Sequence, residues 1–141
     1  MLVAWTAYVD LSRVAVKKYL DNLKTTSSPG PDRVHPRILS EAAGEVTGPL
    51  ATLFRKSVDA GILAEDWEKA SIVSIFKKDS RSEPGNYRPV TLIAIPCKIL
   101  ETLIRNCLMD HLPTRQLLHQ DQHGFRRGRS CNSQLLEVVK D

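Results

Sequence analysis

The sequence lacks the features of secreted and membrane-spanning proteins. Its 141 residues include only three cysteines, Cys97, Cys107 and Cys131, an odd number without C-x-x-C spacing. This pattern excludes a disulfide framework and indicates reduced thiols in an intracellular protein. No apolar run approaches the roughly 20 residues that cross a bilayer, so we expect no membrane contact. The first residues lack a basic region and a long enough apolar core for a signal peptide.

Familiar catalytic motifs are also missing. There is no G-x-x-x-x-G-K-[ST] or G-x-G-x-x-G phosphate loop, no G-x-S-x-G elbow and no H-E-x-x-H zinc motif. One metal-like pattern remains, Cys107-x3-His111 followed by His119-x3-His123. A structural zinc site usually begins with a close cysteine pair, and Cys107 falls on the apolar stripe of its helix. A buried thiol with surface histidines is the simpler interpretation.

The acidic cluster Glu65, Asp66 and Glu68 could in principle hold magnesium. Acidic side chains in the first turn of a short helix, with Trp67 packed inward, explain the cluster more simply. Two-metal phosphoryl transfer needs carboxylates converging from rigid strands, and no apolar strand here carries Asp followed by an Asp-Asp turn. We therefore expect no metal ligand and no catalytic residue in this chain.

The sequence does contain positive charge gathered in particular segments. Hydrophobic residues make up 42% and charged residues 26%, as in a soluble globular protein, and the net charge is +4. Cations cluster at Lys17-Lys18, at Lys77-Lys78 and over 126–129. A solvated face explains Lys17-Lys18 best and explains Lys77-Lys78 about as well as ligand binding. The segment 122–131 combines three arginines with two glycines, which indicates a grip for phosphate groups.

Residue spacing predicts a helix-rich α/β fold in one domain. Helical periodicity predicts a helix over 10–24, with Asp10 or Ser12 as N-cap. It predicts further helices over 36–60, bent near 44–49 and ended by Gly61, over 96–112, and from 134 to 139. Runs of β-branched residues predict strands over 69–76 and 88–93. The two strands should form an antiparallel hairpin with a long basic loop.

Five short strings in this chain occur in the order and spacing of a known family. They are Ser28-Pro29-Gly30-Pro31-Asp32, then 67–76 with Lys77-Lys78, 85–92, 98–101 and 122–131. With these strings, the chain from about Val14 onward resembles the amino-terminal part of the reverse transcriptase domain of non-LTR (LINE-type, jockey-like) retrotransposons. The resemblance implies the fingers subdomain of a right-hand polymerase, with the palm absent.

The resemblance divides residues 1–141, a partial reverse transcriptase domain, into four parts. They are an N-terminal helix over 1–24, a turn over 25–34, the fingers over 35–131, and the start of a helix leading to the palm over 132–141. Asp141 follows a helical run and is not assigned as a metal ligand. Because the catalytic aspartates belong to the palm, we expect this chain alone to be inactive.

The resemblance also implies a reaction and its partners. The family polymerises deoxynucleoside triphosphates (dNTPs) on an RNA template and a DNA primer, and Mg²⁺ is expected for the complete enzyme, which would act in the nucleus. No cofactor is expected in this fragment. We expect the fragment to bind template and dNTP triphosphate. The alternative is a non-catalytic nucleic-acid-binding or protein-interaction module derived from a degenerate element.

Individual roles follow from the same resemblance. The residues that correspond to a fingertip hairpin closing on the dNTP triphosphate are Lys77, Lys78 and Arg88. Those that match the motif expected to hold the template, without reading its sequence, are Gly124, Arg126, Arg127, Gly128 and Arg129. Ser28, Pro29, Gly30 and Asp32 match a turn that touches the template or braces the fingers.

Three residues depart from the family pattern by replacing a usual glycine. Arg33 follows the Ser-Pro-Gly-Pro-Asp string, and if this position needs a positive φ the turn is strained by about 1 kcal/mol. Asp79 stands beside the two lysines and places a negative charge near the expected triphosphate site. Cys97 is the third such residue.

Overall fold

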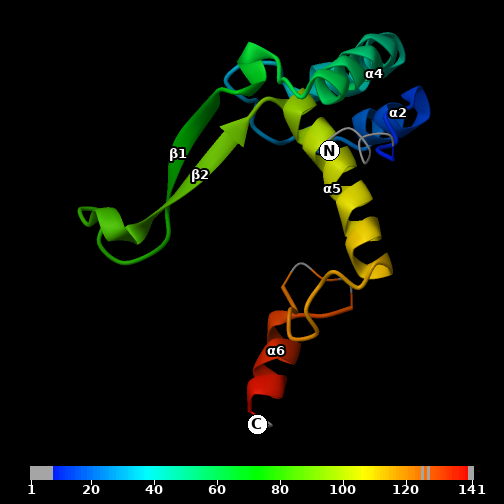
Figure 1. The fold of residues 1–141 in the computed structure, drawn as a ribbon. Coiled ribbons are helices and arrows are strands. Elements are labelled where there is room, and N and C mark those ends of the chain that lie inside the picture. Colours follow the sequence, from blue (N-terminus) through cyan, green and yellow to red (C-terminus); the bar gives the residue numbers. More distant parts are fainter. Residues whose placement is uncertain (1–7, 125, 127, 140–141) are drawn as a thin grey trace. The chain divides into compact units, whose positions relative to one another are not determined.

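The computed structural model describes residues 8–124, 126 and 128–139 (Figure 1). By its internal contacts the chain divides into two compact units, Met1–Leu103 and Ile104–Asp141. The described residues form a helix-rich fold with one small antiparallel sheet, which confirms the predicted α/β class. None of the helices in this part of the chain is long and apolar enough to cross a membrane.

Helix α2 (Arg13–Asp21) confirms the first predicted helix and identifies its cap. The Oγ atom of Ser12 accepts a hydrogen bond from the N–H of Ala15 at 3.2 Å, so Ser12 is the N-cap. Asp10 instead accepts the N–H of Ser12 at 3.0 Å, and hydrogen bonds from Ser12 lower the pKa of Asp10. Val16 and Leu20 are buried on the side of α2 that packs against α4.

The helical stretch predicted over 36–60 is two helices, α3 (Pro36–Glu41) and α4 (Ala43–Ala60). They are separated at Ala42, whose φ of −91° and ψ of 12° leave the helical range. The interruption therefore precedes the predicted bend over 44–49, and α4 continues through Pro49. Gly61 ends α4 in the left-handed conformation with φ 67°, as predicted.

The core of the first unit holds the segments that flank the hairpin, before its first strand and after its second. Phe54 of α4 is fully buried and meets Trp67 edge to face, with ring centroids 5.6 Å apart. Trp67 ends the short 3-10 helix η1 (Glu65–Trp67), which confirms the predicted short helix for Glu65 and Asp66, while Glu68 follows the helix as its C-cap. Directly after the second strand, Ala94 and Ile95 are buried as well. Helix α5 (Ile95–Thr114) adds buried residues from its first turns, namely Cys97, Ile99, Leu100 and Leu103.

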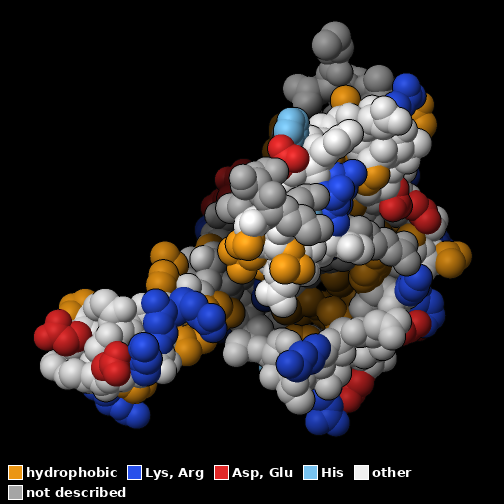
Figure 2. All heavy atoms as spheres, turned by 90° about the horizontal axis from the view of Figure 1, so that it is seen from below, with side chains coloured by type: hydrophobic (Ala, Val, Ile, Leu, Met, Phe, Trp, Pro, Cys, Tyr) orange, Lys and Arg blue, Asp and Glu red, His pale blue; other side chains and the backbone are white. Residues whose placement is uncertain are grey.

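Strands β1 (Ala70–Phe76) and β2 (Tyr87–Ile93) form the predicted antiparallel hairpin. Its register pairs Ala70 with Ile93 and Phe76 with Tyr87. Apolar side chains of β1 are exposed on both faces, with 72% of Ile72 and 45% of Val73 accessible. The hairpin extends away from α2 and α4 (Figure 1). Figure 2 shows it at the left, with Lys, Arg and hydrophobic side chains mixed on its surface.

The described residues of the second unit form the end of α5, loop segments over 115–124 and 128–130, and helix α6 (Cys131–Val138). Helix α5 ends at Thr114, two residues beyond the predicted end. Helix α6 begins three residues before the predicted start because Ser130 and Ser133 cap it reciprocally. The N–H of Ser133 donates to Oγ of Ser130 at 3.2 Å, and the N–H of Ser130 donates to Oγ of Ser133 at 2.9 Å.

Candidate nucleic-acid interface

The Ser-Pro-Gly-Pro-Asp turn is packed against the end of β2. Gly30 is buried, and a β-carbon on it would lie 2.5 Å from the carbonyl oxygen of Ile93 and 2.6 Å from the nitrogen of Ala94. Only glycine fits so close to another backbone. Of the other residues in this turn, Ser28 is exposed, while Pro29 and Asp32 are half-buried. This geometry supports bracing of the hairpin as the role of the turn.

Both turn positions at which the family uses glycine adopt positive φ. Arg33 has φ 57°, with its N–H donating to the carbonyl of Gly30 at 3.0 Å. Asp79 has φ 69° in the hairpin loop. The strain predicted for Arg33 is therefore present, since a side chain crowds the backbone in this region. Cys97 differs, because it is buried in the first turn of α5, where nothing requires glycine.

The hairpin loop over 77–86 is held by its own hydrogen bonds. The N–H of Lys77 donates to the carbonyl of Asn86 at 2.8 Å and extends the ladder by one pair. The amide of Asn86 donates to the carbonyl of Ser80 at 2.8 Å, and the hydroxyl of Tyr87 to that of Arg81 at 2.9 Å. Asn86 and Tyr87 thus shape the loop, and the loop displays its cations on an ordered backbone.

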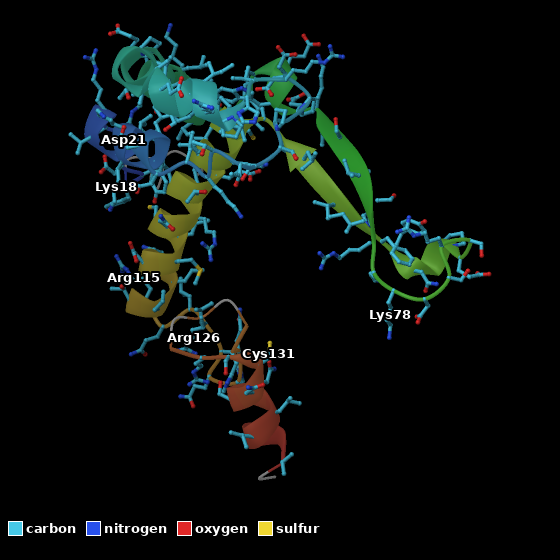
Figure 3. The ribbon with its side chains drawn as sticks, turned by 180° about the vertical axis from the view of Figure 1, so that it is seen from behind. Lys18, Asp21, Lys78, Arg115, Arg126 and Cys131 are labelled. Carbon is cyan, nitrogen blue, oxygen red and sulfur yellow. The ribbon has the colours of Figure 1, made fainter. Side chains whose placement is uncertain are left out.

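The three predicted triphosphate ligands lie at this end of the hairpin. Lys77, Lys78 and Arg88 are exposed, and no carboxylate of the described residues forms an ion pair with them. Arg88 pairs with Ile75, and strand alternation places Lys77 on the same face as both. Lys78 points away from the strands (Figure 3). Asp79 has no ion pair with either lysine.

A fourth cation at this end of the hairpin, Arg81, was not predicted. Its guanidinium lies over the ring of Phe76 at 5.1 Å from the centroid, and Phe76 packs against Tyr87 at 5.5 Å. A cation held on an aromatic face stabilises the loop and stays exposed to solvent. Its position in the sequence, between Lys77-Lys78 and Arg88, was the signal from which it could have been predicted.

In the second unit, two of the predicted template-binding arginines are held by backbone carbonyls. Nη1 of Arg126 donates to the carbonyl of His119 at 3.2 Å, and Nη1 of Arg129 donates to that of Gln120. Figure 3 shows Arg126 in this loop, ahead of Cys131. The backbone also turns here, because the N–H of Arg129 donates to the carbonyl of Arg126 at 3.2 Å. The loop therefore gathers two guanidinium groups on one short stretch of chain.

The remaining predicted residues of this loop differ in how they are placed. Gly128 has φ 77°, which explains a glycine there. Gly124 does not have a positive φ, and a β-carbon on it would meet no atom within 4 Å. Arg127 and Phe125 lie outside the described residues.

His123 was predicted at the surface and is buried instead. Only 4% of it is accessible, Nδ1 lies 2.8 Å from Oγ of Ser133, and Nε2 lies 2.6 Å from Nη1 of Arg129. Its partners are hydrogen-bonding groups, and no metal-binding cluster of three or more His, Cys, Asp or Glu occurs within the described ranges. The contacts of His123 with Arg129 and Ser133 could not be predicted, because residues in a loop have no periodic spacing that shows which side chains meet.

Comparison with known proteins places this chain beside retrotransposon polymerases. No family model matches it. Two curated proteins of Drosophila melanogaster are each 30% identical, "Probable RNA-directed DNA polymerase from transposon BS" over 122 residues and "RNA-directed DNA polymerase from mobile element jockey" over 125. These matches cover 86% and 88% of this chain. "Retrovirus-related Pol polyprotein from type-1 retrotransposable element R1" of Bradysia coprophila is 28% identical over 97 residues, 67% of the chain.

The chain spans 14% of the length of each of the two Drosophila melanogaster relatives and 10% of the Bradysia coprophila relative. The matched stretch nevertheless includes most of the described residues, in both units. The resemblance drawn from the five sequence strings is therefore confirmed: over most of its length, this chain is homologous to one segment of the RNA-directed DNA polymerases of non-LTR retrotransposons.

Proposed function

We propose that this chain is the template- and triphosphate-binding part of the fingers of a non-LTR reverse transcriptase. The observation that carries the proposal is the pair Arg126 and Arg129, each with Nη1 fixed by a backbone carbonyl. Nη1 of Arg129 also contacts Nε2 of His123, while Nε and Nη2 of both side chains have no partner among the described residues. Guanidinium groups held in this way suit the phosphodiester backbone of a nucleic acid, whatever its sequence.

In this proposal the hairpin loop contacts the triphosphate of the incoming dNTP. Lys77 and Arg88 lie on one face at the end of the hairpin, and Lys78 follows Lys77 in the loop and points away from the strands (Figure 3). Exposed cations on an ordered loop can approach a triphosphate without first breaking an ion pair. The bracing of Gly30 against the base of the hairpin supports this role, because it limits movement of the strands that carry the loop.

Bond formation is assigned to other parts of the polymerase. No metal-binding cluster occurs among the described residues, so no residue here is assigned to Mg²⁺. The complete enzyme would supply the palm with its metal-binding carboxylates, and would act in the nucleus on an RNA template and a DNA primer. We propose that the present chain alone binds nucleic acid and does not extend a primer.

Binding of a fluorescein-labelled single-stranded RNA of mixed sequence, followed by fluorescence anisotropy over a salt series, tests the proposal. The variant is Arg126→Gln/Arg129→Gln. Its matched control is Arg37→Gln/Arg55→Gln, which removes the same charge from exposed positions on α3 and α4. Loss of two phosphate contacts should reduce the slope of log affinity against log salt by about 1.4.

The control should retain the wild-type slope, because neither of its arginines belongs to the proposed phosphate-binding pair, Arg126 and Arg129. Equal slopes for all three proteins would contradict template binding by Arg126 and Arg129. Equal loss in the variant and the control would show that only net charge matters.

A further inference from the structure

His123 occupies the centre of a hydrogen-bond chain that ends on Arg129. Two contacts define it, from Nδ1 to Oγ of Ser133 at 2.8 Å and from Nε2 to Nη1 of Arg129 at 2.6 Å. The ring is almost completely buried, with 4% accessible. A buried ring with both nitrogens engaged holds its neighbours in a defined geometry.

The surrounding hydrogen bonds determine which ring nitrogen carries the proton. The hydroxyl of Ser133 donates to the carbonyl of Ser130 at 2.8 Å, so its oxygen can only accept from the ring. Nδ1 of His123 must then be the donor. Nε2 is left with a lone pair, and it accepts a hydrogen bond from the guanidinium of Arg129.

The contact with His123 also determines which edge of Arg129 is left for a ligand. Nη1 has two N–H groups, and they donate to Nε2 of His123 and to the carbonyl of Gln120. Nε and Nη2 have no partner among the described residues. These two atoms form one edge of the planar guanidinium, with two parallel N–H groups that match the oxygens of a phosphate.

We propose that His123 is a positioning residue that orients Arg129, so that the Nε and Nη2 edge of the guanidinium receives a phosphodiester group. His123 itself touches no ligand in this scheme, and acts through its Nε2 acceptor. Ser133 fixes the ring, and because Ser133 also caps α6, the start of this helix and the orientation of Arg129 are linked. This inference rests on the proposed function, since it assigns the phosphate to the template strand.

A double-mutant cycle with His123→Leu and Arg129→Gln tests the inference, with affinity for the labelled single-stranded RNA as the measurement. Leucine removes the acceptor, so His123→Leu alone should weaken binding by about 3- to 10-fold, as should Arg129→Gln alone. The double variant should bind no more weakly than Arg129→Gln. Equal weakening by His123→Leu in both backgrounds would overturn the inference, because it would mean that His123 acts independently of Arg129.

The conservative variant His123→Gln keeps an acceptor and separates positioning from folding. It should bind RNA within about 2-fold of the wild type, and circular dichroism should show its helices intact. A 10-fold loss with intact helices would also overturn the inference. If His123→Leu fails to fold, the RNA affinity of His123→Gln decides whether His123 positions Arg129.

Arginine side-chain NMR of the protein without RNA gives an independent result. Rotation of the Arg129 guanidinium should be slow in the wild type and in His123→Gln, and fast in His123→Leu. Fast rotation in the wild type would contradict positioning by His123. If Arg129→Gln leaves RNA affinity unchanged while rotation is slow in the wild type, the proposed function fails and the contact with His123 stands.

Discussion

Gly30 and Ile93 meet backbone to backbone, at the point where the Ser-Pro-Gly-Pro-Asp turn reaches the end of β2. A β-carbon on residue 30 would lie 2.5 Å from the carbonyl oxygen of Ile93. Because neither backbone can move away cheaply, this contact fixes the base of the hairpin against a segment more than sixty residues earlier in the chain. The turn thus has a structural role that requires no nucleic acid.

Gly30→Ala should therefore destabilise the first unit, by about 3 kcal/mol, through overpacking against backbone. Urea unfolding followed by tryptophan fluorescence measures the loss. Gly44→Ala is the matched control, because a β-carbon there meets no atom within 4 Å and α4 should gain about 0.5–1 kcal/mol. An unchanged stability in Gly30→Ala would mean that the turn does not brace β2.

Arg33→Gly should stabilise the protein by about 1 kcal/mol, because glycine relieves the strain of φ 57°. Asp79→Gly at φ 69° should gain less, since aspartate tolerates this region better than arginine. Thermal unfolding of both variants, each compared with the wild type, measures the difference. The reverse order of the two gains would contradict the better tolerance of aspartate for positive φ.

The three cysteines should react with a thiol reagent at different rates. Burial raises the pKa of the Cys97 thiol, with a smaller effect from Glu101, and the thiolate is the reactive form. Cys131 is exposed and Cys107 is half-buried. In variants that retain one cysteine each, labelling by Ellman's reagent should be fastest at Cys131 and slowest at Cys97. Labelling of Cys97 as fast as Cys131 would contradict its burial.

The single variants Lys77→Gln and Arg88→Gln should each weaken dNTP binding about 5-fold, if the hairpin contacts the triphosphate. The measurement is the affinity for a fluorescent dNTP in the presence of Mg²⁺. Arg81→Gln is the control, because Arg81 lies over the ring of Phe76 and is not assigned to the ligand. A larger loss in Arg81→Gln than in the other two variants would move the triphosphate site away from the face of Lys77 and Arg88.

Local patterns in the sequence predicted the hairpin and most helices. Runs of β-branched residues correctly predicted both strands. Ser12 and Gly61 marked helix ends that the structure confirms, because caps depend on a few neighbouring residues. The break at Ala42 was not predicted, because alanine is a good helix former and nothing in its type marks an interruption.

The candidate site could be predicted only in part, for a physical reason. Lys77, Lys78 and Arg126 were recognisable as cations in glycine- or proline-containing loops. The role of His123 depends on where its ring lies relative to Arg129 and Ser133, which residue spacing in a loop does not determine. The close approach of Gly30 to Ile93 is likewise a tertiary contact, without a signal in local sequence.

Ultraviolet crosslinking of the single-stranded RNA to the full chain, followed by mass spectrometry of the crosslinked peptides, tests the central claim most directly. The account predicts crosslinks within 117–133, around Arg126 and Arg129, and their loss in Arg126→Gln/Arg129→Gln. Crosslinks confined to the surface of α3 and α4, and unchanged in that variant, would contradict it.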